Sequence, residues 1–122
     1  MAVASAIGND LVHIPGFSAA FSASFKARVY SDQEIEQIEQ YKADPLVRYA
    51  TTWAAKEAVF KALKQILGEP LGLNWKDIII FREGNIPKVR IAAERFKKYS
   101  FSLSLSHDGD YAAAVVLASA NE

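Results

Sequence analysis

The chain has 122 residues, 51% of them apolar, so one compact domain over residues 1–122 is expected rather than two. Cysteine is absent, which excludes disulfides, thiolate metal sites and a cysteine nucleophile. Fourteen basic and fourteen acidic residues balance, and this neutrality predicts neither nucleic acid nor a membrane surface as a partner.

The first segment of the chain is apolar and strand-like. Residues 2–14 are rich in Val, Ile and Leu and end at Pro15-Gly16, which predicts a strand carrying Asp10 and His13 towards its far end. The opening apolar run is too short for a membrane span and lacks the basic start of a signal peptide. We therefore expect a cytoplasmic protein.

Two short helices are predicted next. Phenylalanine recurs at every fourth position over residues 17–25, as on the buried side of a helix. Ser31 and Glu34 then form a capping-box pattern, which begins a second helix that ends near Tyr41. Packing and capping explain these residues without any function.

The longest predicted helix begins at Asp44-Pro45 and continues without Gly or Pro until Gly68. Two charged residues, Lys56 and Glu57, interrupt its apolar stripe. Glu57 is therefore expected on or beside the buried face, where an unpaired carboxylate is costly. The stripe, by steps of three, four or seven, consists of Leu46, Tyr49, Trp53, Phe60, Leu63 and Leu67.

Two hairpins are predicted in the second half of the chain. Strand-like segments at 75–82 and 88–92 flank a turn at Gly84-Asn85, and a short charged helix follows at 93–99. The clearest hairpin comes last, with strands at 101–107 and 111–117 around Asp108-Gly109. The predicted fold class is α+β, with helices packed on an antiparallel sheet.

Asp10 and Glu57 stand out because each carboxylate lies within an apolar segment. Lys61, four residues after Glu57, allows a simple helix ion pair as the plainer explanation. Two carboxylates from separate elements are also the usual minimum for holding magnesium beside a phosphate. Lys56, Lys61 and Lys64 would then supply the positive charge.

His107 is the second candidate position. It ends the apolar face of the strand at 101–107, close to an opening, whereas Ser106 has the opposite parity and is predicted to be an edge hydroxyl. The sequence contains no phosphate loop, dinucleotide fingerprint or glycine-framed nucleophile. Any phosphate binding must therefore come from side chains and metal.

Three blocks of this sequence resemble the holo-acyl-carrier-protein synthases among the 4′-phosphopantetheinyl transferases. The blocks are GNDLV at 8–12, WAAKEAVFKAL at 53–63 and SLSH at 104–107. Their order and spacing and the chain length agree with that family, so the resemblance covers essentially the whole chain and implies the fold of the family.

The resemblance implies roles for the singled-out residues. Asp10 and Glu57 would bind magnesium together with the pyrophosphate of coenzyme A, and Glu57 and Lys61 would be catalytic. The predicted coenzyme-binding residues are Lys56, Lys61, Lys64, Ser106 and His107.

The implied reaction is attack by a carrier serine on the pantetheine-side phosphorus of coenzyme A, with loss of 3′,5′-ADP. A carboxylate or a metal-held water near Glu57 would accept the serine proton. The acceptor would be an acyl carrier protein or a carrier domain of a synthase. The resemblance also implies a homotrimer with active sites between subunits.

Two positions depart from the family pattern. Gly16 and Thr52 stand where many relatives have arginine, which in the first case helps to dock the acidic carrier. We therefore predict that Lys26, Arg28 or Arg48 compensates at the carrier-binding surface.

Two other functions use the same residues. A small metal-dependent phosphohydrolase would use Asp10 and Glu57 with magnesium but would need no protein acceptor. A non-catalytic trimeric binding module would keep Glu57 and Lys61 as a plain ion pair and would have no turnover.

Overall fold

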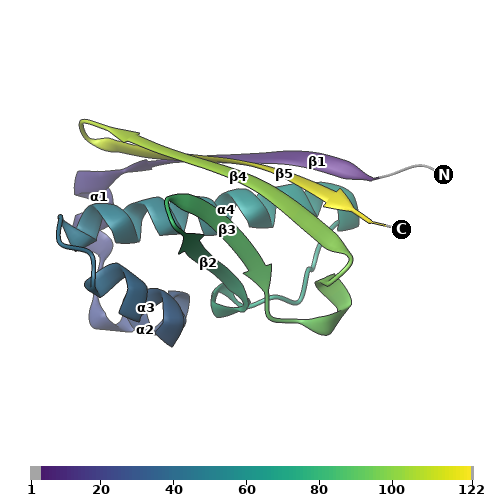
Figure 1. Cartoon of the computed structure of the whole chain (residues 1–122), viewed down its shortest axis with the longest axis horizontal. Coiled ribbons are helices and arrows are strands. Elements are labelled where there is room, and N and C mark those ends of the chain that lie inside the picture. The colour runs from purple at the N-terminus through teal and green to yellow at the C-terminus, as the bar shows by residue number, and fades with distance from the viewer. Residues whose placement is uncertain (1–3, 122) are drawn as a thin grey trace.

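A long helix, α4 (Pro45–Leu67), lies across the inner face of an antiparallel sheet in the computed structural model, which describes residues 4–121. Helices and a second, smaller sheet cover the opposite side of α4 (Figure 1). The other elements, in chain order, are β1 (Ser5–His13), α1 (Ile14–Ala20), α2 (Ala23–Val29), α3 (Asp32–Glu39), the 3₁₀ turn η1 (Trp75–Asp77), β2 (Ile78–Glu83), β3 (Ile86–Ile91), the 3₁₀ turn η2 (Glu94–Phe96), β4 (Tyr99–Asp108) and β5 (Tyr111–Ala120).

The larger sheet brings the two ends of the chain together. Its strand order is β1-β5-β4 with antiparallel pairing throughout, and β2 and β3 form a separate hairpin. Asp10 of β1 is paired with Ala114 of β5, and His107 of β4 is paired with the neighbouring Ala112. The predicted α+β class, with helices on an antiparallel sheet, is confirmed.

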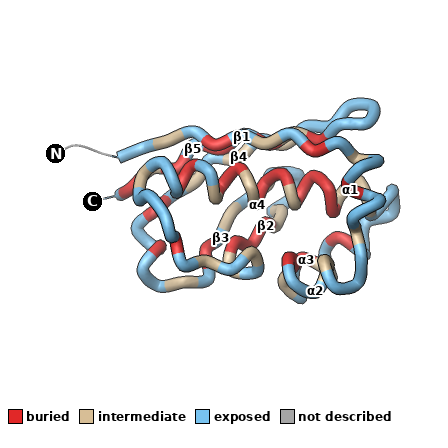
Figure 2. The backbone as a smooth tube through the Cα atoms, turned by 180° about the vertical axis from the view of Figure 1, so that it is seen from behind, coloured by how far each residue is buried: buried red, intermediate tan, exposed pale blue. Residues whose placement is uncertain are grey.

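Alanines and one glycine bring α4 close to this sheet. Ala54, Ala55, Ala58 and Ala62 are fully buried, and Figure 2 shows buried positions along most of α4. A Cβ atom on Gly8 would lie 1.8 Å from the carbonyl oxygen of Ala58, so only glycine permits this approach of helix to strand. Asp10, two residues further on the same face of β1, is thereby brought against α4.

The predicted apolar stripe of α4 is therefore only partly right. Tyr49 and Leu63 are buried, but Leu67 is 49% exposed. The helix is buried on several sides rather than along one stripe, and small residues form the side that meets the sheet.

Segment boundaries differ from prediction most clearly at three places. The helix predicted over 17–25 is divided into α1 and α2, because the Ser22 hydroxyl accepts a hydrogen bond from the Phe25 N–H at 3.0 Å and caps a new helix. Residues 75–77 are a 3₁₀ turn before β2, and the helix predicted over 93–99 is limited to η2. Residues 2–3 of the predicted first strand lie outside the described residues.

Candidate active site

Asp10, Glu57 and Lys61 meet where β1 runs alongside the middle of α4. The Lys61 ammonium donates to Oδ1 of Asp10 at 3.0 Å and to the Asn9 carbonyl at 3.1 Å. The Asp10 side chain is 10% exposed and the Lys61 side chain 47% exposed. The structure thus brings both predicted carboxylates and the predicted phosphate-binding lysine together, and it pairs Lys61 with Asp10 rather than with Glu57.

The Glu57 carboxyl is set up to hold a proton. Burial, followed by the hydrogen bond and the charge of the adjacent Asp10 carboxyl, raises its pKa from 4.5 to about 7, while Lys61 opposes the shift.

One oxygen of this pair lacks a partner. With both carboxyls ionised, Oδ2 of Asp10 is buried and accepts no hydrogen bond, whereas Oδ1 is paired with Lys61. A buried carboxylate oxygen without a partner is costly, and either a proton on Glu57 or a cation would satisfy it.

The donor set fits magnesium bound through two carboxylates. Among residues 4–121 there is no group of three or more His, Asp or Glu side chains that would enclose a metal. Magnesium keeps several waters and commonly binds through one or two carboxylates and the phosphates of a substrate. The unpartnered oxygen of Asp10 beside Glu57 matches that pattern.

Side chains of α4 also cover the open edge of β1. Gln65 donates to the Ile7 carbonyl at 2.6 Å, and Lys61 donates to the Asn9 carbonyl two residues along the strand. β1 is an edge strand of the sheet, so these carbonyls have no strand partner on that side. Lys61 is thus held by the same strand that carries Asp10.

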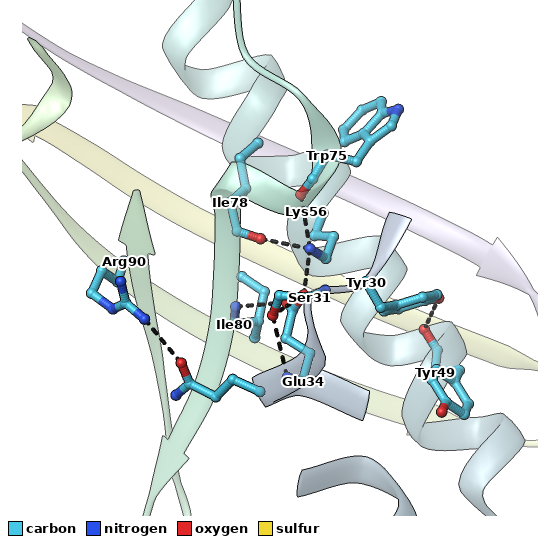
Figure 3. A network of polar contacts seen from close by, with 10 residues as sticks. Tyr30, Ser31, Glu34, Tyr49, Lys56, Trp75, Ile78, Ile80 and Arg90 are labelled. Atoms are coloured by element: carbon cyan, nitrogen blue, oxygen red, sulfur yellow. Dashed lines mark hydrogen bonds and ion pairs between the residues drawn. The ribbon is translucent and has the colours of Figure 1, made fainter. Parts of the chain in front are cut away.

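Lys56 does not reach this surface. Its side chain is fully buried, and its ammonium is paired with Glu34 and hydrogen-bonded to the carbonyls of Trp75 and Ile78 (Figure 3). Because a lysine ammonium has three protons, these three acceptors use its full donor capacity. The prediction that Lys56 contacts coenzyme phosphate is wrong for this structure, since burial and partners leave it no exposed donor.

The other predicted coenzyme residues lie in two places. Lys64 is exposed near the end of α4, paired with Glu69 at 2.8 Å. Ser106 and His107 line a pocket of about 440 Å³ by the first half of α4. Its other lining residues are Tyr41, Ala43, Asp44, Val47, Arg48, Thr51, Arg82 and Leu105.

This pocket is basic and lies apart from Asp10 within one chain. Burial and the charge of the nearby Arg48 lower the pKa of Arg82, and the Arg48 guanidinium lies over the Tyr41 ring at 3.6 Å. Thr51 of the pocket and Glu57 are separated by about 9 Å of helix axis, at 1.5 Å per residue. Sequence reasoning missed Arg82, because nothing in the pattern of β2 separates it from an ordinary edge residue.

For Glu34 the sequence predicts only the capping box, which the structure confirms at the start of α3. Its pairing with Lys56 was missed. The available signal was a lysine within the apolar stripe of α4, since a buried ammonium requires an acidic partner.

Comparison with known proteins identifies the family. The 4′-phosphopantetheinyl transferase superfamily matches residues 6–116. A holo-[acyl-carrier-protein] synthase of Sulfurimonas denitrificans is 37% identical over 117 residues, covering 90% of this chain and 91% of that protein. A fatty acid synthase alpha subunit of Dothistroma septosporum is 36% identical over 120 residues, which are 93% of this chain but 7% of that protein.

A solved structure agrees with these matches. The ACPS–CoA complex of Chronobacterium ammoniagenes has a TM-score of 0.83 at 30% identity and covers 98% of this chain and 99% of that chain. The chain therefore belongs to the 4′-phosphopantetheinyl transferase superfamily. Within that superfamily it is similar to holo-[acyl-carrier-protein] synthases over nearly its whole length, which confirms the resemblance found in the sequence.

Proposed function

We propose that this chain transfers the 4′-phosphopantetheine group from coenzyme A to a serine of an apo acyl carrier protein or carrier domain. The observation that carries the proposal is the Asp10, Glu57 and Lys61 cluster on the scaffold of this family. In the reaction, the serine oxygen forms a bond to the pantetheine-side phosphorus, the pyrophosphate P–O bond breaks, and 3′,5′-ADP leaves.

Asp10 and Glu57 are proposed to hold magnesium with the coenzyme pyrophosphate, because Oδ2 of Asp10 is buried without a partner beside a second carboxyl. Bound there, magnesium would neutralise charge on the pyrophosphate. Lys61 is half-exposed, so its ammonium is available to a phosphate oxygen while its stem stays against β1.

Glu57 is the proposed acceptor of the serine proton. In the metal-free protein the pKa of Glu57 is about 7, so the carboxyl can take up a proton at neutral pH. Its carboxyl lies beside Asp10, the other proposed magnesium ligand, and in this proposal therefore next to the coenzyme pyrophosphate.

The pocket beside His107 is proposed to take the nucleotide end of coenzyme A. Arg48 and Arg82 supply two positive charges there, and Ser106 and His107 supply hydrogen-bonding groups. Lys64, near the end of α4, is proposed as a further contact for phosphate.

A homotrimer is part of the proposal. The outer face of the large sheet exposes a row of apolar side chains, which a monomer would leave in water: Ile7, Leu11, Tyr111, Val115 and Leu117. Assembly through this face would place active sites between subunits, with Asp10 and Glu57 of one chain near His107 of the next.

The proposed carrier surface involves α2 and the start of α4. Arg28 lies beside the Phe25 ring, where it remains available to an acidic carrier. Lys26 is paired with Glu39, so it must leave that partner before it can bind the carrier. Arg48 is stacked on Tyr41.

The cytoplasm is the proposed site of the reaction. In residues 4–121 no helix is long and apolar enough to cross a membrane.

Release of 3′,5′-ADP from coenzyme A, measured by chromatography, tests the reaction type. We expect release only with magnesium and an apo carrier, supplied as a free-standing acyl carrier protein in one arm and as a synthase carrier domain in another. The matched control is each carrier with its acceptor serine changed to alanine, which should give no release. Release without a carrier would favour the phosphohydrolase, and no release in either arm would favour the binding module.

A further inference from the structure

The Lys56 ammonium joins three elements inside the protein. It lies 2.7 Å from Oε1 of Glu34 on α3 and donates to the Trp75 carbonyl at 2.8 Å and the Ile78 carbonyl at 2.6 Å. Both charged side chains are 0% exposed. Lys56 thus fixes the segment that leads into β2 against α4, as Figure 3 shows.

The Glu34 carboxylate is equally occupied. Its Oε1 also accepts from the Ser31 N–H at 2.8 Å, and its Oε2 accepts from the Ile80 N–H at 2.8 Å. The pair therefore has no unused donor or acceptor directed to solvent.

A buried ion pair needs an explanation other than stability. Well-packed apolar residues of similar volume are often as stable as a buried pair, because both charges must lose their hydration. An apolar pair makes no hydrogen bonds. The Lys56 ammonium, in contrast, donates charge-assisted hydrogen bonds that fix the positions of two particular carbonyl groups.

The carbonyl of Trp75 is one of those groups, and the Trp75 ring packs on two aromatic side chains of α4. The Trp75 ring centroid lies 4.8 Å from that of Trp53 and 5.2 Å from that of Phe60. Trp53 precedes Glu57 by four residues and Phe60 follows it by three, so both rings flank Glu57 on the helix surface. On the helix surface, Lys56 lies on the side of Trp53 and Phe60 opposite to Glu57.

We propose that Lys56 and Glu34 are positioning residues for the transfer reaction, because they hold Trp75 over Trp53 and Phe60 and so fix the aromatic wall beside Glu57. This inference rests on the proposed function. The wall keeps water from one side of the Glu57 carboxyl, which strengthens the electrostatic interactions of that group with its partners.

The double variant Glu34→Gln/Lys56→Met tests the proposal. It removes both charges together, so that neither remains buried alone, and it removes the donor to the Trp75 carbonyl while keeping side-chain length. Val116→Ala, a cavity variant in the buried part of β5, is the control for lost stability. Glu94→Gln/Lys97→Met makes the same chemical change at an exposed pair and is the control for lost charge.

Two readouts are compared between these variants. Trp53 and Trp75 are the only tryptophans of the chain, so their coupled signal in the near-ultraviolet circular dichroism spectrum reports the wall without any turnover. Steady-state transfer to an apo carrier gives kcat and the KM for coenzyme A separately.

In the double variant we expect an altered tryptophan signal and a fall in kcat of about tenfold or more, with KM changed by less than about threefold, because misplacement acts on the reacting geometry. Both controls should keep the wild-type signal and kcat. A kcat within about twofold of wild type in the folded double variant would overturn the proposal, as would an unchanged tryptophan signal.

If the double variant fails to fold, Trp75→Leu replaces it. This variant keeps the carbonyl anchor and removes the ring, and the same loss of kcat is expected; wild-type kcat would overturn the proposal. Failure of the proposed function would look different, because wild-type protein would then modify no carrier, while the tryptophan signal would still show whether Lys56 and Glu34 fix the wall.

Discussion

At the residue scale, the Asp10 carboxylate has two unequal oxygens. Lys61 holds Oδ1 at 3.0 Å, and Oδ2 is buried without a partner next to Glu57. Either a proton on Glu57 or a metal ion would therefore fill the space between the two carboxyls. Each lowers the electrostatic cost of placing the two carboxyls side by side.

Magnesium binding should therefore release a proton near neutral pH. The pKa of Glu57 is about 7 without metal, and a bound cation favours the ionised form, so affinity for magnesium should rise with pH and level off above about pH 8. Calorimetric titration in two buffers of different ionisation enthalpy measures the released protons. Binding without proton release around pH 6.5 would contradict this assignment, and Glu57→Gln should show neither release nor tight binding.

Glu57 should also lower the stability of the metal-free protein at alkaline pH. Its folded-state pKa lies above the ordinary 4.5, so between pH 4.5 and about 7 the folded state binds more protons than the unfolded state, and stability falls as pH rises. Glu57→Gln removes this effect. Since the group is partly exposed, we expect a gain of about 2–4 °C in Tm at about pH 8 and little change near pH 4.5. Equal shifts at both pH values would contradict the pKa.

At the element scale, the approach of α4 to β1 depends on Gly8. A Cβ atom at this position would overlap the Ala58 carbonyl oxygen at 1.8 Å, and neither backbone can yield without moving Asp10 relative to Glu57. Gly8, the glycine of the first sequence block, is thus required for the packing that places Asp10 beside Glu57.

Gly8→Ala should cost about 3 kcal/mol of unfolding free energy, because overpacking between two backbones cannot be relieved by a rotamer change. Gly16→Ala is the matched control: its Cβ would meet only the His13 side chain, and alanine favours the helix, so its effect should be within about 1 kcal/mol. Urea denaturation measures both. Equal costs for the two variants would show that α4 and β1 are not in this close contact.

The sequence predicted most elements because their signals are local. Capping residues set the starts of α3 and α4, and alternation set the last hairpin. Asp10, Glu57 and Lys61 could be singled out because a charge inside an apolar segment needs a partner. The burial of Lys56 could not be predicted, since its partners come from α3 and from the segment before β2, which are distant in sequence.

At the scale of the whole molecule, one face of the large sheet is packed on α4, and the other exposes apolar side chains on β1 and β5. Ile7 and Leu11 on β1 are 61% and 65% exposed, in contrast to the inward residues of the same strand. Assembly would cover this face and bring the pocket beside His107 of one chain towards the carboxylates of another.

Ile7→Asp should therefore reduce the assembly to a monomer, because three such charges would be buried at the shared face. Ile86→Asp is the matched control, since Ile86 is equally exposed, at 60%, but lies on the separate β2–β3 hairpin. Light scattering coupled to size-exclusion chromatography gives the masses. A wild-type monomer, or an Ile7→Asp variant that keeps the wild-type mass, would contradict assembly through this face.

The most direct measurement is the intact mass of an apo carrier protein after incubation with coenzyme A, magnesium and this protein. We predict a gain of one phosphopantetheine group with wild-type protein, and a rate at least about a hundredfold lower with Asp10→Asn or Glu57→Gln, because each removes a ligand or base needed in the transition state. Wild-type rates in either variant, or no gain on any carrier tested, would contradict the transfer reaction at this site.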